Sequence, residues 1–398
     1  MKTLINGRLI LPDSSGDFKV FSGKAINFDE KIISIGEPLE GAELIDAENN
    51  FIAPGFINIH IHGAAGFDTM DEDIDALKTF AEFMPTCGVT SFLPTTMTMP
   101  LDKIYRALER IRIGKNFSHG ARILGAHVEG PFISKKFKGA QVEENILPAD
   151  FELIKNFADV IKIITVAPEE LWNKGKGKWE MGKVENPFSL LPSSFSLDFI
   201  ARCLEKNIIV SIGHSAATYE LAMAAIARGA NHITHLFNAQ TGFHHRKPGI
   251  VGAALDSNAT VELITDNVHV HPAAQRLVAK VKPRSEIILI TDSIRACGIG
   301  NGISELGGQK VLVKGNLATL EDGTIVGSVA KMNEVLKIFC ENTGFDIASG
   351  VELVTKNPAV ELNIFDRLGS LEVGKAADIT IFDDNFNIRK IFVRGREN

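Results

Sequence analysis

Two histidines, His60 and His62, lie two residues apart in the apolar segment from Pro54 to Gly63. Side chains at positions i and i+2 of a β-strand point to the same face, so both imidazoles are expected to face one centre. Four other apolar segments end in a group of the same chemical kind: Glu129, His214, His235 and Asp292. Imidazole nitrogens and carboxylate oxygens are usual ligands of zinc and iron in hydrolytic sites. The spacing therefore predicts a metal centre.

The donor set predicts one or two divalent ions of zinc, iron or a similar metal. Five residues are the candidate ligands, with Glu129 bridging if two ions bind: His60, His62, Glu129, His214 and His235. A bound ion makes water acidic enough to attack as hydroxide near neutral pH. Hydrolysis of an amide also needs a group that takes the proton from water and returns it to the leaving nitrogen, and Asp292 is the candidate. His127 shares a face with Glu129 but lies one pleat deeper, so it is expected to support the ligands or pack in the core.

The segments that carry these groups predict how they are brought together. Eight apolar runs of strand length alternate for the most part with helical patterns, which predicts an α/β fold, a (β/α)8 TIM barrel with parallel strands. The runs cover residues 54–63, 89–96, 123–129, 160–167, 208–214, 231–235, 260–265 and 287–292. Active sites of this fold lie at the carboxyl ends of the strands, where the candidate ligands stand.

Short alternating runs, broken by Gly, Asp, Ser and Pro, occupy both ends of the chain and indicate β-hairpins. They predict a small β-sandwich domain built from residues 1–54 and 363–398, beside a barrel of residues 55–362. A further hairpin is expected over Val311–Val326, turning at Asp322-Gly323. Apolar periodicity predicts helices over Ile74–Phe83, Leu101–Ile111, Leu197–Lys206, Tyr219–Arg228, Ala273–Val281 and Lys331–Glu341, with N-caps at Ser196 and Thr218 and a C-cap at Gly229.

Composition limits the function classes. The chain has 398 residues, 45% of them hydrophobic, which suffices for one large core and a smaller unit. Its formal net charge of -7 provides no general basic field for nucleic acid or an anionic membrane. The four cysteines lack metal-knuckle spacing, and neither a signal peptide nor a run of roughly 18 apolar residues is visible. We therefore expect a cytoplasmic protein with a small-molecule partner and with no nucleic-acid or membrane partner.

Three other segments carry weaker signals. His244 to Lys247 is a cationic cluster that fits either a solvated loop or a phosphate site, in which Arg246 would bind phosphate with two hydrogen bonds. Trp172 to Trp179 mixes bases and aromatics but is short and broken by glycine, which does not favour nucleic-acid contact. Gly298 to Gly302 lacks the ending of a P-loop and is expected to be a flexible loop beside Asp292.

Seven motifs together resemble the amidohydrolase superfamily and, within it, the N-acetylglucosamine-6-phosphate deacetylases, over essentially the whole chain. They are Pro54-Gly55-Phe56-Ile57, His60-x-His62, Glu129-Gly130-Pro131-Phe132, Gly213-His214-Ser215, Thr234-His235-Leu236-Phe237-Asn238-Ala239, His244-His245-Arg246-x-Pro248-Gly249 and Val268-His269-Val270-His271. The combination is specific, whereas a single motif is not. The resemblance implies metal-dependent hydrolysis of N-acetylglucosamine-6-phosphate to glucosamine-6-phosphate and acetate, in amino-sugar catabolism or cell-wall sugar recycling.

The resemblance also implies roles for individual residues. Carried over by motif, Glu129, His214 and His235 hold the main ion, and His60 and His62 add a second. Asp292 acts as acid and base, and His269 polarises the acetyl carbonyl. The implied substrate-binding residues are Gln141, Asn238, Ala239, Arg246, His269, Ile325, Val326 and Gly327. In the family the phosphate-binding arginine reaches across a dimer interface, so a homodimer is implied.

Three residues depart from the family pattern. Gln141 stands where a sugar-contacting histidine is common, Asn58 replaces the usual aspartate before the histidine pair, and Asn267 replaces a usual glycine before His269. Three alternatives stay open: an N-acetylgalactosamine-6-phosphate deacetylase, an amidohydrolase that acts on a cyclic amide through a carbamylated lysine, and a non-catalytic barrel. The fourth strand carries no lysine at its rim, since Lys162 lies too early, and all ligands are retained, which disfavours the last two.

Overall fold

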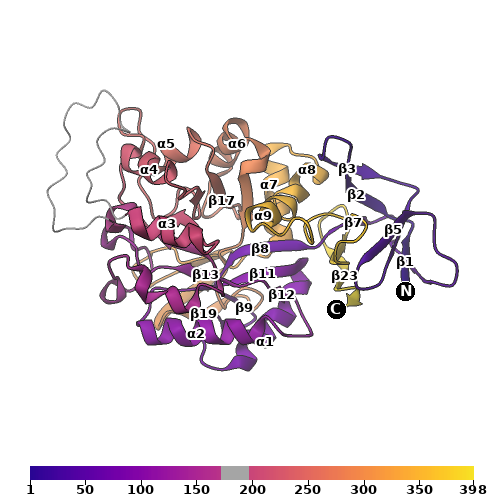
Figure 1. Cartoon of the computed structure of the whole chain (residues 1–398), viewed down its shortest axis with the longest axis horizontal. Coiled ribbons are helices and arrows are strands. Elements are labelled where there is room, and N and C mark those ends of the chain that lie inside the picture. Colours follow the sequence, from indigo (N-terminus) through magenta and orange to yellow (C-terminus); the bar gives the residue numbers. More distant parts are fainter. Residues whose placement is uncertain (172–196) are drawn as a thin grey trace.

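The computed structural model describes residues 1–171 and 197–398, and its centre is a nearly closed barrel of parallel strands (Figure 1). Within these residues the hydrogen-bonded order is β12-β11-β13-β14-β15-β16-β17-β18, with β8 paired to β11. The barrel strands are β8 (Phe56–Ile61), β11 (Val89–Thr96), β12 (Arg122–Ile123), β13 (Ala126–Glu129), β14 (Ile161–Val166), β15 (Ile209–Ile212), β16 (His232–Ile233), β17 (Thr260–Ile264) and β18 (Ile287–Ile290). The predicted (β/α)8 barrel is confirmed, because all eight apolar runs form its strands.

The seam between β18 and β8 closes in two different ways. Ile57, near the amino end of β8, and Leu289, within β18, donate their N–H groups to the carbonyls of Val354 and Leu353 at 2.7 and 3.1 Å. At the carboxyl ends, the N–H of Asp292 donates to the carbonyl of His60 at 3.0 Å. The direct bond at the carboxyl ends sets two candidate site residues beside each other.

Helices cover the barrel, with α1 and α2 on one side of the strands and α4 to α7 on the other (Figure 1). Six helices match the predicted ones, and three short helices in the described part of the chain were not predicted: α5, α8 and α9. A helix of two turns or less, started or interrupted by Gly or Pro, leaves no readable periodicity. The helices are α1 (Ile74–Phe83), α2 (Leu101–Gly114), α3 (Leu197–Glu205), α4 (Tyr219–Ile226), α5 (Gly249–Leu255), α6 (Pro272–Val281), α7 (Met332–Thr343), α8 (Ile347–Glu352) and α9 (Lys356–Glu361).

The predicted helix caps have different outcomes. The hydroxyl of Thr218 accepts from the N–H of Leu221, so it caps α4 as expected. That helix ends earlier than predicted, with Ala227 as its cap, so the C-cap prediction at Gly229 is wrong; Gly229 lies beyond the helix end with a left-handed φ of 101°. Ser196 and the segment from Trp172 to Trp179 lie outside the described residues. No described helix is long and apolar enough to span a membrane.

The two chain ends combine into sheets that lie together at one end of the molecule (Figure 1). In the described chain, β7 pairs with both β2 and β22, so N-terminal and C-terminal strands share one sheet. The two sheets enclose a common core that includes Leu4, Ile52 and Phe392, as a β-sandwich does. The domain limits at residues 54 and 363 stay a prediction. The strands are β1 (Lys2–Ile5), β4 (Ala25–Phe28), β5 (Ile32–Gly36) and β6 (Glu43–Asp46) in one sheet, and β2 (Arg8–Pro12), β3 (Phe18–Phe21), β7 (Phe51–Pro54), β22 (Ile379–Phe382), β23 (Ile388–Val393) and β24 (Arg396–Glu397) in the other.

The hairpin expected over Val311–Val326 is only partly right. A sheet of β19 (Gly302–Leu306), β20 (Gln309–Lys314) and β21 (Leu317–Thr319) occupies this region and begins before the predicted start. Its first turn uses Gly307 and Gly308, whose φ angles of 59° and 84° suit a tight hairpin. Gln309 binds the carbonyl of Ala140 through its side-chain amide at 2.7 Å, which fixes the insertion over the mouth of the barrel.

Candidate metal centre and active site

The candidate ligands converge at the carboxyl ends of the barrel strands. Two groups of three each bring one ligand atom per residue within 4.8 Å of the others: Glu129 with His214 and His235, and His60 with His62 and Asp292. All six side chains are buried. The structure therefore brings together the six residues that the sequence singled out, although the sequence assigned Asp292 only to proton transfer and not to a ligand group.

Glu129 lies between the two groups. Its Oε1 is 3.0 Å from Nε2 of His235 and 3.2 Å from Nε2 of His214, and its Oε2 is 3.3 Å from Nε2 of His62. Oδ1 of Asp292 lies 3.3 Å from Nε2 of His62. Oε1 of Glu129 also lies 3.4 Å from Nε2 of His60, so the carboxylate contacts imidazoles of both groups, as a group that bridges two ions must.

Hydrogen bonds at the far side of three rings select their tautomers. The Nδ1 atoms of His62 and His214 donate to the carbonyls of Thr95 and Phe137 at 3.2 and 2.9 Å. Nδ1 of His60 donates to Oε2 of Glu262 at 2.9 Å. Because these oxygens only accept, a neutral ring carries its lone pair on Nε2, the atom turned toward Glu129.

The donor set fits a divalent cation. Among the described residues, the buried Nε2 of His60 has no hydrogen-bond partner, as expected of a nitrogen that serves as a metal ligand. Outer hydrogen bonds that fix imidazole tautomers are typical of metal centres. Three to five nitrogen and oxygen donors around one point match the ligand chemistry of zinc and iron.

Neighbouring imidazoles favour the ionised form of the two carboxylates of the centre despite burial. Burial acts to raise the pKa of Glu129, but the imidazoles of His214 and His60 hold it well below its usual value. Burial likewise opposes the ionisation of Asp292, and His60 and His62 nevertheless lower its pKa. Two buried negative charges therefore face the same space, which suits a divalent cation.

Backbone strain marks the same residues. His214, His235 and Asp292 each lie two residues beyond the end of a strand and have φ angles of 45°, 29° and 48°. The backbone of a residue other than glycine adopts this left-handed region at a cost of about 1–3 kcal/mol. The surrounding fold maintains this strain at three strand ends and thereby aims three functional side chains into the barrel mouth.

A cavity of about 220 Å³ opens above the centre. Seven of the eight predicted substrate-binding residues line it together with His62, Glu129, His214, His235 and Asp292: Gln141, Asn238, Ala239, His269, Ile325, Val326 and Gly327. Arg246 does not line it. Its side chain is exposed on the loop before α5, with Nη1 2.6 Å from Nε2 of His245.

Gln141 contacts the centre as well as the cavity. Its side-chain carbonyl accepts from the N–H of Thr98 at 2.9 Å, which turns the amide nitrogen toward Oε2 of Glu129 at 2.8 Å. The sequence predicted only a sugar contact here. The amide thus also holds the central carboxylate.

Sequence reasoning missed Asp266, which orients His269. Oδ2 of Asp266 is 2.7 Å from Nδ1 of His269, and Oδ1 accepts from the N–H groups of Val268 and His269 at 2.9 and 2.8 Å. Asp266 follows the carboxyl end of β17, the position that had revealed the other site residues, so the same signal could have found it. Because Nδ1 of His269 contacts Asp266, its Nε2 remains available for an interaction in the cavity that this residue lines.

Two departures from the family pattern fit the local backbone. Asn267 has a left-handed φ of 64°, which asparagine tolerates nearly as glycine does, and its side chain accepts from Gln275 at 3.1 Å. Asn58 donates to the hydroxyl of Thr291 at 2.8 Å.

His127 is fully buried, and its Nδ1 lies 3.0 Å from the carbonyl of Ile59. This agrees with the core position predicted for it.

Comparisons with known proteins identify the family of the chain. The model of the amidohydrolase family matches residues 51–397, and the chain belongs to this family. It is a hydrolase by this membership. The N-acetylglucosamine-6-phosphate deacetylase of Bacillus subtilis (strain 168) is 40% identical over 87% of this chain and 84% of its own length. The N-acetylgalactosamine-6-phosphate deacetylase of Escherichia coli O157:H7 is 32% identical over 92% of each chain. The crystal structure of N-acetylglucosamine-6-phosphate deacetylase from Pasteurella multocida superposes with a TM-score of 0.88 at 30% identity, covering 100% of this chain and 99% of that one.

We predict that Glu129→Gln lowers the metal content of the purified chain to well below one ion per chain, measured by elemental analysis. The variant loses a negative charge that both ligand groups share. Glu352→Gln is the matched control, because that carboxylate is also buried but binds Arg284 and the N–H of Phe18. Equal metal content in Glu129→Gln and the parent chain would contradict the assignment.

Proposed function

We propose that the chain is a metal-dependent deacetylase that hydrolyses the N-acetyl group of N-acetylglucosamine-6-phosphate to glucosamine-6-phosphate and acetate. The convergence of imidazoles and carboxylates beneath a cavity lined by the predicted sugar-contacting residues is the observation that carries the proposal. Relatives at 40% and 36% identity, from Bacillus subtilis and Lysinibacillus sphaericus, bear the name of this activity.

In this proposal Glu129, His214 and His235 hold the main ion, and His60 and His62 contribute to a second, of zinc, iron or a similar metal. When bound, such an ion supplies Lewis acidity and a more acidic water. Asp292, with its ionised carboxylate at the edge of the cavity, accepts the proton of the attacking water. The same carboxyl group then delivers this proton to the amine nitrogen as the amide bond breaks.

His269 is proposed to stabilise the negative charge that develops on the acetyl oxygen. With the carboxylate of Asp266 against Nδ1, the doubly protonated ring is the form that donates a hydrogen bond from Nε2. Asn238, Ala239 and the segment from Ile325 to Gly327 line the cavity and are proposed to contact the sugar.

We also propose that Arg246 binds the 6-phosphate in the site of a second copy of the chain, so that the active form is a cytoplasmic homodimer. Its exposed position away from the cavity of its own chain supports this role. The loop around it also carries Lys247, which adds to the positive charge available to a phosphate.

Two rival substrates have less support. An N-acetylgalactosamine-6-phosphate deacetylase is a relative at 32% identity, below the 36% and 40% of the two N-acetylglucosamine-6-phosphate deacetylases.

The second rival is a cyclic-amide hydrolase that holds two ions through a carbamylated lysine. Such an enzyme needs that lysine at the end of β14. Lys162 lies at the second position of β14, and its side chain is only half-buried, so Glu129 would be the residue that holds two ions together if two bind.

The proposed activity predicts acetate release from N-acetylglucosamine-6-phosphate by the metal-loaded chain, and its loss after treatment with a chelator. Initial rates on the two epimeric 6-phosphates then identify the preferred sugar, since the epimers differ only at C4. We expect the gluco substrate to be faster. A metal-replete sample that releases no acetate from either epimer would refute the proposal.

Asp292→Asn is expected to lower kcat by about 10²- to 10⁴-fold, because the amide cannot accept and return a proton. Metal bound by Glu129, His214 and His235 should remain, so acetate release is measured beside elemental analysis of the same sample. If the variant loses all its metal, Asp292 acts chiefly as a ligand and the proton-transfer role is not supported.

Arg246→Ala is expected to raise KM for the phosphorylated substrate by about tenfold or more, since hydrogen bonds to charged groups contribute about 1.5–3 kcal/mol each. The rate on unphosphorylated N-acetylglucosamine should stay unchanged. Lys19→Ala, which removes an exposed lysine on β3 in the sheets formed by the chain ends, serves as the control. An unaltered KM in Arg246→Ala would rule out phosphate binding by this residue.

A further inference from the structure

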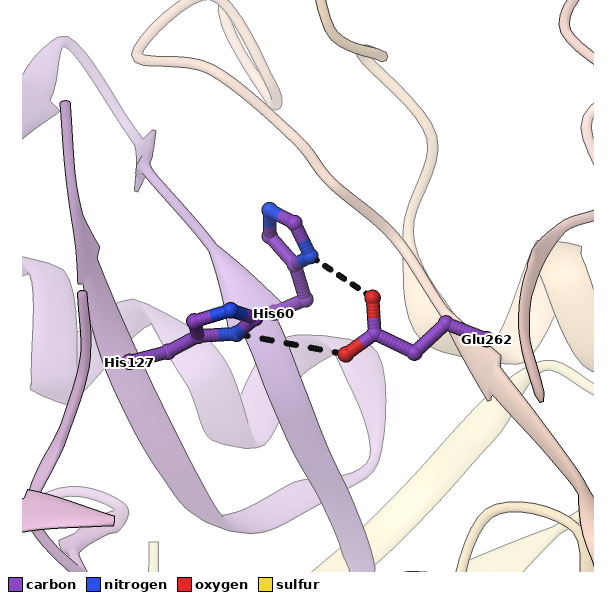
Figure 2. Close-up of side chains that lie close together, drawn as sticks. All are labelled: His60, His127 and Glu262. Carbon is purple, nitrogen blue, oxygen red and sulfur yellow. Dashed lines mark hydrogen bonds and ion pairs between the residues drawn. The ribbon is translucent and has the colours of Figure 1, made fainter. Parts of the chain in front are cut away.

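A buried glutamate, Glu262, lies inside the barrel next to the proposed metal centre. It stands in the middle of β17 and has no exposed surface. Figure 2 shows its carboxylate facing the rings of His60 and His127, which come from β8 and β13. Neither the expected ligand set nor the expected substrate contacts include it.

Each oxygen of this carboxylate has defined partners. Oε2 accepts from Nδ1 of His60 at 2.9 Å and from the backbone N–H of His235 at 3.1 Å. Oε1 is 3.1 Å from Nε2 of His232 and 3.9 Å from Nδ1 of His127. One oxygen therefore contacts two candidate metal ligands that belong to different strands, β8 and the end of β16.

The cluster of His60, His127 and Glu262 does not itself form a second metal site. Nδ1 of His127 donates to the carbonyl of Ile59 at 3.0 Å, and its Nε2 is 2.8 Å from the hydroxyl of Thr165. Nδ1 of His60 carries the hydrogen that it donates to Glu262. The two Nδ1 atoms that face Glu262 in Figure 2 therefore have no lone pair for a cation, and the three side chains form a hydrogen-bonded cluster, not a metal site.

Glu262 is held in place from its other side. Nδ1 of His232 is 2.9 Å from Oε1 of Glu361, and Oε2 of Glu361 accepts from the hydroxyl of Thr260 at 2.8 Å. Glu361 ends α9 and its side chain is 19% exposed, so the chain of contacts runs from the centre of the barrel to its surface. A carboxylate fixed at both oxygens cannot rotate away from His60.

We propose that Glu262 is a positioning residue of the metal centre: it selects the tautomer of His60 that directs the Nε2 lone pair to the ion, and it anchors the backbone of His235. This inference rests on the metal centre of the proposed function. The backbone contact matters because His235 has a left-handed φ of 29°, and the N–H bond to Glu262 helps to hold that conformation. Loss of such an outer contact weakens metal binding by about 10- to 100-fold.

The test compares Glu262→Met with Glu361→Met in the full chain. Both variants remove a carboxylate from His232, but only the first removes the partner of His60 and His235. After chelator treatment, the affinity for Zn²⁺ is measured by competition with a chromophoric chelator, and Tm is measured beside it. We expect Glu262→Met to bind Zn²⁺ about 10- to 100-fold more weakly and Glu361→Met to match the parent. Unchanged affinity in Glu262→Met, or an equal loss in both variants, would overturn the proposal.

Two further variants separate positioning from general destabilisation. Glu262→Gln keeps an oxygen that accepts from Nδ1 of His60, so it should recover most of the affinity and it remains informative if the methionine variant does not fold. In a His60→Ala background, the substitution of Glu262 should cost less affinity than in the parent, because part of its action passes through that ring. Equal costs in both backgrounds would contradict action through His60. A parent chain that binds Zn²⁺ but releases no acetate would refute the proposed substrate and leave this measurement valid.

Discussion

The structure depends on one electrostatic constraint, the burial of two carboxylates and four imidazoles around a single space. Glu129 is 2% exposed and contacts imidazoles of both ligand groups, so removing it would leave those nitrogens facing one another. Buried ionised groups are tolerated when they are paired and hydrogen-bonded. The fold therefore has to bring opposite charges, or a cation, to this point.

The barrel satisfies the constraint by its geometry. Parallel strands end at one rim, so residues from β8, β13, β15, β16 and β18 meet without long loops. The seam between β18 and β8 adds a direct bond from Asp292 to His60 at the same rim. The left-handed φ angles of His214, His235 and Asp292 then turn these side chains inward, whereas a regular strand would direct them elsewhere.

The sequence predicted the strands and the donors because both signals are local. An apolar run followed by a histidine or a carboxylate is visible within about ten residues, and the barrel fold supplies the convergence. Glu262 was missed because its partners are side chains from other strands, and a charged residue inside an apolar run gives no hint of them. Helices α8 and α9 were missed because each has 6 residues and contains Gly350 or Pro358. The early start of the inserted sheet depends on the turn at Gly307-Gly308. The position of this hairpin is fixed by tertiary contacts such as that of Gln309 with Ala140.

The centre is supported from two opposite sides by groups that need not bind the ion. Glu262 holds His60 from within the barrel, and Gln141 holds Glu129 from the mouth. An amide nitrogen has two hydrogens, and only one of those of Gln141 is directed to Glu129. The second is available to the cavity that Gln141 lines. Gln141 can therefore fix the central carboxylate and still offer a hydrogen-bond donor to the cavity.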